Sequence, residues 1–155
     1  MKQRIYIDTS VFGGYFDSEF EEFTKPLFER IKNKELKVIY SSLTEDEIEK
    51  APEKVKKLIR SLPADVIDFV EVSEEAVELA MTYIKEEVVG KTSFDDCVHI
   101  ALATIHKADF LVSWNFKHIV NVQRIRGYNS VNIKLGYSTI DIRSPREFMK
   151  YENEE

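Results

Sequence analysis

The stretch that decides the fold is "RIYIDTSVF", residues 4–12. Its apolar run at 5–7 is typical of a buried strand. Asp8 follows directly, two hydroxyl residues come next, and the chain turns apolar again at Val11. A carboxylate at the end of a buried strand requires a partner, because an ionised group loses its hydration there.

The same kind of apolar run recurs along the chain and alternates with helical patterns. We predict further strands at residues 37–41, 66–72, 109–113 and 131–133. We predict helices at residues 20–33, 44–50, 53–62, 74–88 and 94–107. Strands that alternate with helices indicate βαβ units, so we predict an α/β fold whose parallel sheet is covered on both faces.

Length and composition indicate one soluble globular domain. The 155 residues predict a single domain at 1–150, followed by a flexible acidic tail at 151–155. Cys97 is the only cysteine, which excludes an intramolecular disulfide and fits a reducing compartment. Asp8 interrupts the apolar run that a secretory signal needs, and no run approaches the roughly 18 residues of a membrane span. We therefore expect a cytoplasmic protein without a membrane segment.

Charge is distributed unevenly along the chain. The net charge of −6 argues against indiscriminate binding of nucleic acid. Residues 117–150 nevertheless contain seven Lys or Arg against two Asp or Glu. A solvated basic surface and a phosphate-binding surface explain this segment equally well on charge alone. The candidates for phosphate binding are Lys117, His118, Arg124 and Arg126.

Polar side chains follow the strand-like runs, where sites form in parallel sheets. If three of the acids converge, a pair about 4 Å apart repels by about 4 kcal/mol at an effective dielectric constant of ~20. Such a cluster requires a cation, and oxygen ligands favour Mg²⁺ or Mn²⁺. The acids concerned are Asp8, Glu47 and Asp96, and the residues that follow the strand-like run at 109–113 are Ser113, a further candidate for substrate binding, and Asn115.

Helix capping is the alternative explanation for each acid taken singly. Both Thr44-x-x-Glu47 and Ser93-x-x-Asp96 fit a capping box. His99 shares a helix face with Asp96, which allows it to orient that acid or to contact a phosphate. A satisfied histidine at the edge of the core explains His99 better.

Three segments together resemble the PIN-domain nucleases, a family that includes VapC-type toxins. They read "IYIDTSVF", "SSLTEDEI" and "DCVHIALATIHKADFLVSWN". The resemblance implies a three-layer α/β/α sandwich with a central parallel sheet. It also implies Mg²⁺- or Mn²⁺-dependent hydrolysis of phosphodiester bonds, usually in single-stranded RNA.

By this resemblance Asp8, Glu47 and Asp96 are the family's first three acids and bind the metal. The register of "D-x-x-H-I-A" selects Asp96 rather than its neighbour, and Ser10 is the small polar residue that assists the site. The fourth acid is replaced by Asn115, which offers an amide oxygen but no charge. A second metal would therefore be held less tightly.

The sequence thus predicts a metal-dependent endoribonuclease, in which Ser10 and Asn115 position a metal-bound water or a phosphate oxygen. Asn115 motivates the alternative, a non-catalytic PIN-like module that binds RNA or protein. A receiver-like phosphorylation domain ranks last, because it would require adjacent acids after the first strand. A toxin role would imply an antitoxin that blocks the acidic pocket. A homodimer could use Phe12, Tyr15 and Phe16, which fit a core equally well.

Overall fold

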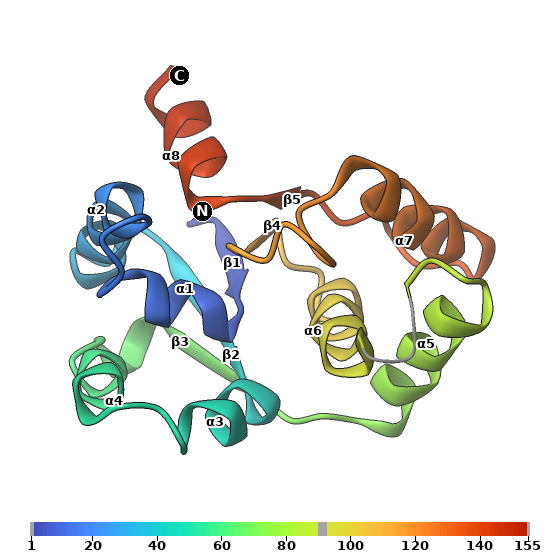
Figure 1. The fold of residues 1–155 in the computed structure, drawn as a ribbon, viewed down its shortest axis with the longest axis horizontal. Helices are drawn as coiled ribbons and strands as arrows, with labels where there is room; N and C mark the ends of the chain where they lie inside the picture. The colour runs from blue at the N-terminus through green and yellow to red at the C-terminus, as the bar shows by residue number, and fades with distance from the viewer. Residues whose placement is uncertain (1, 90–92, 155) are drawn as a thin grey trace.

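The computed structural model describes residues 2–89 and 93–154 (Figure 1). Within these residues the strands form one five-stranded sheet in the order β3-β2-β1-β4-β5. All of the strand pairs are parallel, which confirms the predicted sheet. The strands are β1 (Arg4–Ile7), β2 (Lys37–Ser41), β3 (Ile67–Val70), β4 (Phe110–Val112) and β5 (Ile142–Arg143).

Helices cover the sheet on both faces and complete the three layers that we expected. In Figure 1, α1, α2 and α4 lie on one side of the sheet, and α5, α6 and α7 lie on the other. The helices are α1 (Thr9–Gly14), α2 (Glu21–Lys32), α3 (Ser42–Ile48), α4 (Glu53–Arg60), α5 (Glu74–Lys85), α6 (Phe94–Ile105), α7 (Val122–Lys134) and α8 (Pro145–Glu154), with a short 3-10 turn η1 (Ala64–Val66). Within the described part of the chain, no helix is long and apolar enough to cross a membrane.

Successive side chains of β1 alternate between the two faces of the sheet, so this strand contributes to two hydrophobic cores. Ile5 and Ile7 pack into the core beneath α1, α2, α4 and α8. Tyr6, between them, packs into the core beneath α5, α6 and α7. Successive side chains of a strand point to opposite faces, so a central parallel strand must be apolar throughout. The chain becomes polar only at Asp8, where the strand leaves the sheet.

The strand predicted at 131–133 is wrong, because these residues lie within α7. The helix begins after Asn121, whose side chain accepts a hydrogen bond from a backbone N–H of the first turn. Tyr128, Val131 and Asn132 are buried at helical spacing. Packing of this face outweighs the β propensity of a Val-Asn-Ile run.

The last strand of the sheet is β5, which pairs with β4 and was not predicted. It spans two residues, too few to show a period. A capping box follows it: Glu147 N–H donates to Ser144 Oγ at 3.1 Å, and Ser144 N–H donates to Glu147 Oε1 at 3.2 Å. The helix that it begins, α8, continues to Glu154, so the secondary structure has no boundary at residue 150.

Gly14 lies in close contact with a side chain next to the polar edge of the sheet. A Cβ at this position would lie 2.7 Å from the indole ring of Trp114 and 3.1 Å from Thr24 Oγ1. The indole N–H donates to that hydroxyl at 2.8 Å, so the ring is held in place. We expect Gly14→Ala to lower the free energy of unfolding by about 1–3 kcal/mol in urea denaturation.

The neighbouring glycine provides a matched control. A Cβ at Gly13 would meet no atom within 4 Å. Gly13→Ala is therefore expected to leave stability unchanged or to raise it by up to about 1 kcal/mol, because alanine favours a helix. Equal effects of the two substitutions would contradict the packing that we describe.

Candidate functional site

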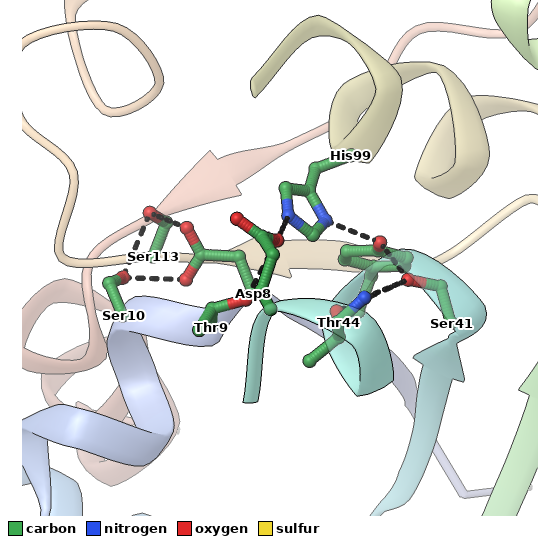
Figure 2. A network of polar contacts seen from close by, with 9 residues as sticks. Asp8, Thr9, Ser10, Ser41, Thr44, His99 and Ser113 are labelled. Atoms are coloured by element: carbon green, nitrogen blue, oxygen red, sulfur yellow. Dashed lines mark hydrogen bonds and ion pairs between the residues drawn. The ribbon is translucent and has the colours of Figure 1, made fainter. Parts of the chain in front are cut away.

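The carboxyl ends of the strands meet at one edge of the sheet, and polar side chains gather there. Asp8 follows β1, Ser41 ends β2 and Ser113 follows β4. Figure 2 shows two hydrogen-bonded groups near one another, one with Ser10 and Ser113 around Asp8 and the other extending from Thr9 through His99 to Ser41 and Thr44. This is the edge at which parallel α/β sheets place their sites.

Asp8 is held by two serine hydroxyls. It is only 4% exposed. Ser10 Oγ donates to Asp8 Oδ1 at 2.6 Å, and Ser113 Oγ donates to Oδ2 at 2.7 Å. The backbone N–H groups of Trp114 and Asn115 donate to these same two hydroxyls, each at 2.9 Å. Asp8 precedes α1, but its side chain makes no capping hydrogen bond, so helix capping does not explain it.

Glu47 reaches the site from α3. Its Oε1 accepts a hydrogen bond from Thr9 Oγ1 at 2.9 Å and meets His99 Nε2 at 2.6 Å. The capping box with Thr44 is wrong, because α3 begins after Ser41, whose hydroxyl accepts the Thr44 N–H at 3.1 Å. Glu47 does not cap α3; its carboxylate contacts the first residue of α1, Thr9, and His99 of α6.

A buried network lies behind Glu47. His99 is 2% exposed, and its Nδ1 lies 2.6 Å from the hydroxyl of Tyr6. That hydroxyl lies 2.8 Å from Ser41 Oγ. The network therefore connects two strand ends with a helix from the other half of the chain. The sequence pattern indicates a role for His99 but none for Tyr6 or Ser41.

Asp96 is half-buried in the first turn of α6, whereas Asp95 beside it is exposed. The side chain of Asn115 forms a hydrogen bond that lowers the pKa of Asp96. The amide oxygen of Asn115 accepts the backbone N–H of His118 at 3.0 Å, which leaves the amide nitrogen to face Asp96. The capping box with Ser93 is also wrong, because Ser93 makes no capping bond and its hydroxyl lies 2.9 Å from His118 Nδ1.

The three acids differ in how their surroundings affect ionisation. Burial raises the pKa of Asp8, although His99, Ser10 and Ser113 act against it, and the charge of Asp96 raises it further. Burial also raises the pKa of Asp96, and the charge of Glu47 adds to this effect. Burial would raise the pKa of Glu47 too, but the hydrogen bonds from His99 and Thr9 lower it below its usual value. Burial therefore disfavours the charged form of Asp8 and of Asp96, and the groups that lower their pKa offset this only in part.

The donor set fits a hard divalent cation. Within the described residues, no group of three or more His, Cys, Asp or Glu side chains is arranged to hold a metal ion directly. Mg²⁺ keeps several of its waters and is bound by one or two carboxylates in most protein sites. Carboxylates that raise one another's pKa are the groups that such a hydrated cation would neutralise.

The basic segment does not act as one surface. His118 lies beside the site, and its charge lowers the pKa of Asp96. Lys117 is exposed next to it. Arg124 donates to the carbonyl of Val88 at 2.9 Å, so it ties α7 to the end of α5. Arg126 is exposed on α7. The structure thus brings one of the four candidate cations to the acids.

The raised pKa of Asp8 has a consequence for stability in EDTA. A raised pKa in the folded state means that an acid favours folding most below its ordinary value, here 3.8, and less as the pH rises through the raised value. We expect Asp8→Asn to be more stable than the wild type at neutral pH and to lose this advantage on acidification. Urea unfolding between about pH 4 and pH 8 measures the difference. A wild type that gains stability over the variant as the pH rises would contradict the burial of an ionised Asp8.

Comparisons with known proteins agree with this architecture. The family model of the PIN domain matches residues 5–117. A search of curated proteins returns no match. One similar structure is VapBC2 from Rickettsia felis bound to promoter DNA, with 12% identity and a TM-score of 0.58, covering 92% of this chain and 98% of that chain.

Two further structures are equally similar. VapC20 from Mycobacterium tuberculosis, described as a sarcin-ricin loop cleaving toxin, has 15% identity and a TM-score of 0.57 over 73% of this chain and 91% of that chain. DNA-bound VapBC from Salmonella typhimurium has 15% identity and a TM-score of 0.56 over 94% of this chain and 99% of that chain. These TM-scores show a shared fold, and the family model covers most of the chain. The chain belongs to the PIN-domain family, and its structural neighbours are toxins of the VapC and FitB kind.

Proposed function

We propose that the protein is a metal-dependent endoribonuclease that hydrolyses single-stranded RNA. One observation carries the proposal: Asp8, Glu47 and Asp96 interact electrostatically at one edge of the sheet, where burial raises the pKa of Asp8 and of Asp96. Nucleases of this type use a cation at such a cluster to bind the scissile phosphate. Membership of the PIN-domain family supports the same reaction class.

Each residue of the site has a role in this proposal. Asp8, Glu47 and Asp96 would hold Mg²⁺ or Mn²⁺, which polarises a phosphate oxygen and makes a bound water more acidic. Ser10 and Ser113 fix the Asp8 carboxylate so that both of its oxygens keep one orientation.

Two residues after the fourth strand are suited to the substrate. His118 lies beside Asp96 and brings positive charge to the acids, and Lys117, the residue before it, is exposed. We propose that they attract RNA phosphates, which are otherwise repelled by the acids. Arg124 and Arg126, which sit on α7, stay predictions from sequence as phosphate ligands.

The test is cleavage of several single-stranded RNAs by the purified protein in Mn²⁺, in Mg²⁺ and in EDTA. We expect cleavage with either metal and none in EDTA. Absence of cleavage in Mn²⁺, while the protein still binds Mn²⁺, would reject the nuclease and favour the second candidate below.

That second candidate is a PIN-like module that binds RNA or protein without cutting. It is favoured by Asn115, whose side chain approaches Asp96 as a hydrogen-bond donor rather than as a further acid. Such a module would bind RNA equally well in Mn²⁺ and in EDTA. A gel-shift measurement in both conditions distinguishes it from the nuclease.

We further propose that the chain is the toxin of a toxin–antitoxin pair in the cytoplasm. The structural neighbours include a toxin–antitoxin complex from Klebsiella pneumoniae, with 17% identity and a TM-score of 0.52. An antitoxin would place an arginine or lysine among the three acids, because a positive charge would favour the ionised forms of Asp8 and Asp96, which burial disfavours. Arrest of bacterial growth by the wild type, but not by an Asp8→Asn variant, would support this role; equal growth would reject it.

A homodimer is part of the same proposal. Phe12 is fully buried and belongs to the core, so it cannot form the interface. Tyr15 and Phe16 are half-buried in the turn that follows α1, and they stay candidates. Light scattering with Tyr15→Ser tests them: loss of a dimer supports the assignment, and an unchanged dimer rejects it.

A further inference from the structure

The buried network of Ser41, Tyr6, His99 and Glu47 is more elaborate than a satisfied core requires. His99 is 2% exposed and Tyr6 is fully buried. Both ring nitrogens of His99 are used, one by Glu47 Oε1 and one by the Tyr6 hydroxyl, each at 2.6 Å. A buried polar group that loses its partner costs about 1–3 kcal/mol. A position that served only to pack the core would therefore favour an apolar side chain, which needs no partner.

The hydrogen bonds of this network fix the orientation of the imidazole ring. Nε2 of His99 lies 2.6 Å from Glu47 Oε1, and Nδ1 lies 2.6 Å from the Tyr6 hydroxyl. That hydroxyl lies 2.8 Å from Ser41 Oγ, so it is held from a second strand as well. Because both ring nitrogens have a partner, Nε2 is kept directed at Glu47.

The two donors to Glu47 converge on one oxygen. Both Thr9 Oγ1 and His99 Nε2 reach Oε1, at 2.9 and 2.6 Å. Across residues 2–89 and 93–154, no hydrogen-bond donor reaches the other oxygen, Oε2. One oxygen is thus fixed by two elements, while the second is left available to a ligand.

We propose that His99 is a positioning residue, which holds Glu47 by Oε1 and thereby presents Oε2 to the divalent cation. Tyr6 and Ser41 hold His99 in turn. His99 lies three residues after Asp96 on α6, so one face of this helix supplies one acid and orients another. The inference rests on the proposed metal site but does not depend on RNA cleavage.

The test is a double-mutant cycle on Mn²⁺ affinity, measured by titration calorimetry. It uses the wild type, His99→Leu, Glu47→Gln and the double variant. We expect His99→Leu to weaken binding about 10–100-fold, as for other residues that orient metal ligands. Since His99 acts through Glu47, the double variant should bind within about twofold of Glu47→Gln alone.

A second pair of variants changes the core less and tests the same role if His99→Leu does not fold. Tyr6→Phe removes only the hydroxyl that holds His99, and it should weaken Mn²⁺ binding in the wild type but not in Glu47→Gln. Tyr83→Phe is the matched control. Tyr83 is also fully buried in the same core, but its hydroxyl donates to Asn132 on α7. It should leave Mn²⁺ affinity unchanged while losing similar stability in EDTA.

Rescue by a conservative variant completes the design. His99→Gln keeps an N–H near the position of Nε2 and should recover part of the affinity that His99→Leu loses. Unchanged affinity in His99→Leu or Tyr6→Phe, or losses that multiply with Glu47→Gln, would overturn the positioning role. Absence of Mn²⁺ binding by the wild type would instead overturn the metal site itself, so the two failures are distinguishable.

Discussion

Asp96→Asn is expected to lower Mn²⁺-dependent cleavage of single-stranded RNA at least about 100-fold. The substitution removes one of three charges that would hold the cation and leaves the shape of the side chain unchanged. Asn115 can still form a hydrogen bond with the new amide, so the local fold should persist. Initial rates on a labelled RNA in Mn²⁺, with circular dichroism of both proteins, measure the effect.

The adjacent acid is the control. Asp95 is exposed in the same turn of α6 and carries the same charge. Asp95→Asn should leave the rate within about twofold of the wild type, since an exposed charge is screened by solvent. Equal losses in the two variants would indicate a general electrostatic effect rather than a ligand at position 96.

Asn115→Asp is expected to raise Mn²⁺ affinity and the cleavage rate about tenfold, or about 1.4 kcal/mol. A new carboxylate beside Asp96 adds one charge where the cation would lie. A unit charge about 4 Å away contributes at most about 4 kcal/mol at an effective dielectric constant of ~20, so the expected gain is moderate. Calorimetry and initial rates measure it on the same preparation.

The stability of this variant provides an internal check. The substitution replaces a hydrogen-bond donor to Asp96 with a like charge, so the variant should be less stable than the wild type in EDTA. In saturating Mn²⁺, the variant should instead be more stable than the wild type. A variant that is less stable in both conditions, with no gain in affinity, would contradict a cation between these two positions.

The acids of the candidate site could be predicted from the sequence, whereas the residues that hold these acids by hydrogen bonds could not. Asp8 could be identified because a carboxylate interrupts an apolar run at the end of a strand. Glu47 and Asp96 each fit a helix cap by local spacing, and the structure uses neither for capping. Local sequence patterns cannot distinguish a helix cap from a site residue, because the contacts that decide between the two join residues far apart in the chain.

The residues that position the acids could not be predicted for the same reason. Thr9 contacts Glu47 across 38 positions, and Tyr6 contacts His99 across 93. Tyr6 reads as an ordinary core residue of a strand, since its hydroxyl has no sequence signature. Likewise, the β-branched residues of α7 favour a strand until the packing of Tyr128 and Asn132 fixes a helix. The fold class depends on periodicity and was predicted, whereas these pairings depend on tertiary contacts.

The central claim is that acids from three parts of the chain form one cation site. Titration calorimetry of the wild type and Asp8→Asn with Mn²⁺ tests it most directly, because it needs no RNA and no activity. We expect the wild type to bind and Asp8→Asn to bind at least about tenfold more weakly, since a buried charged ligand is lost. No binding by the wild type, or equal binding by the two proteins, would contradict the account.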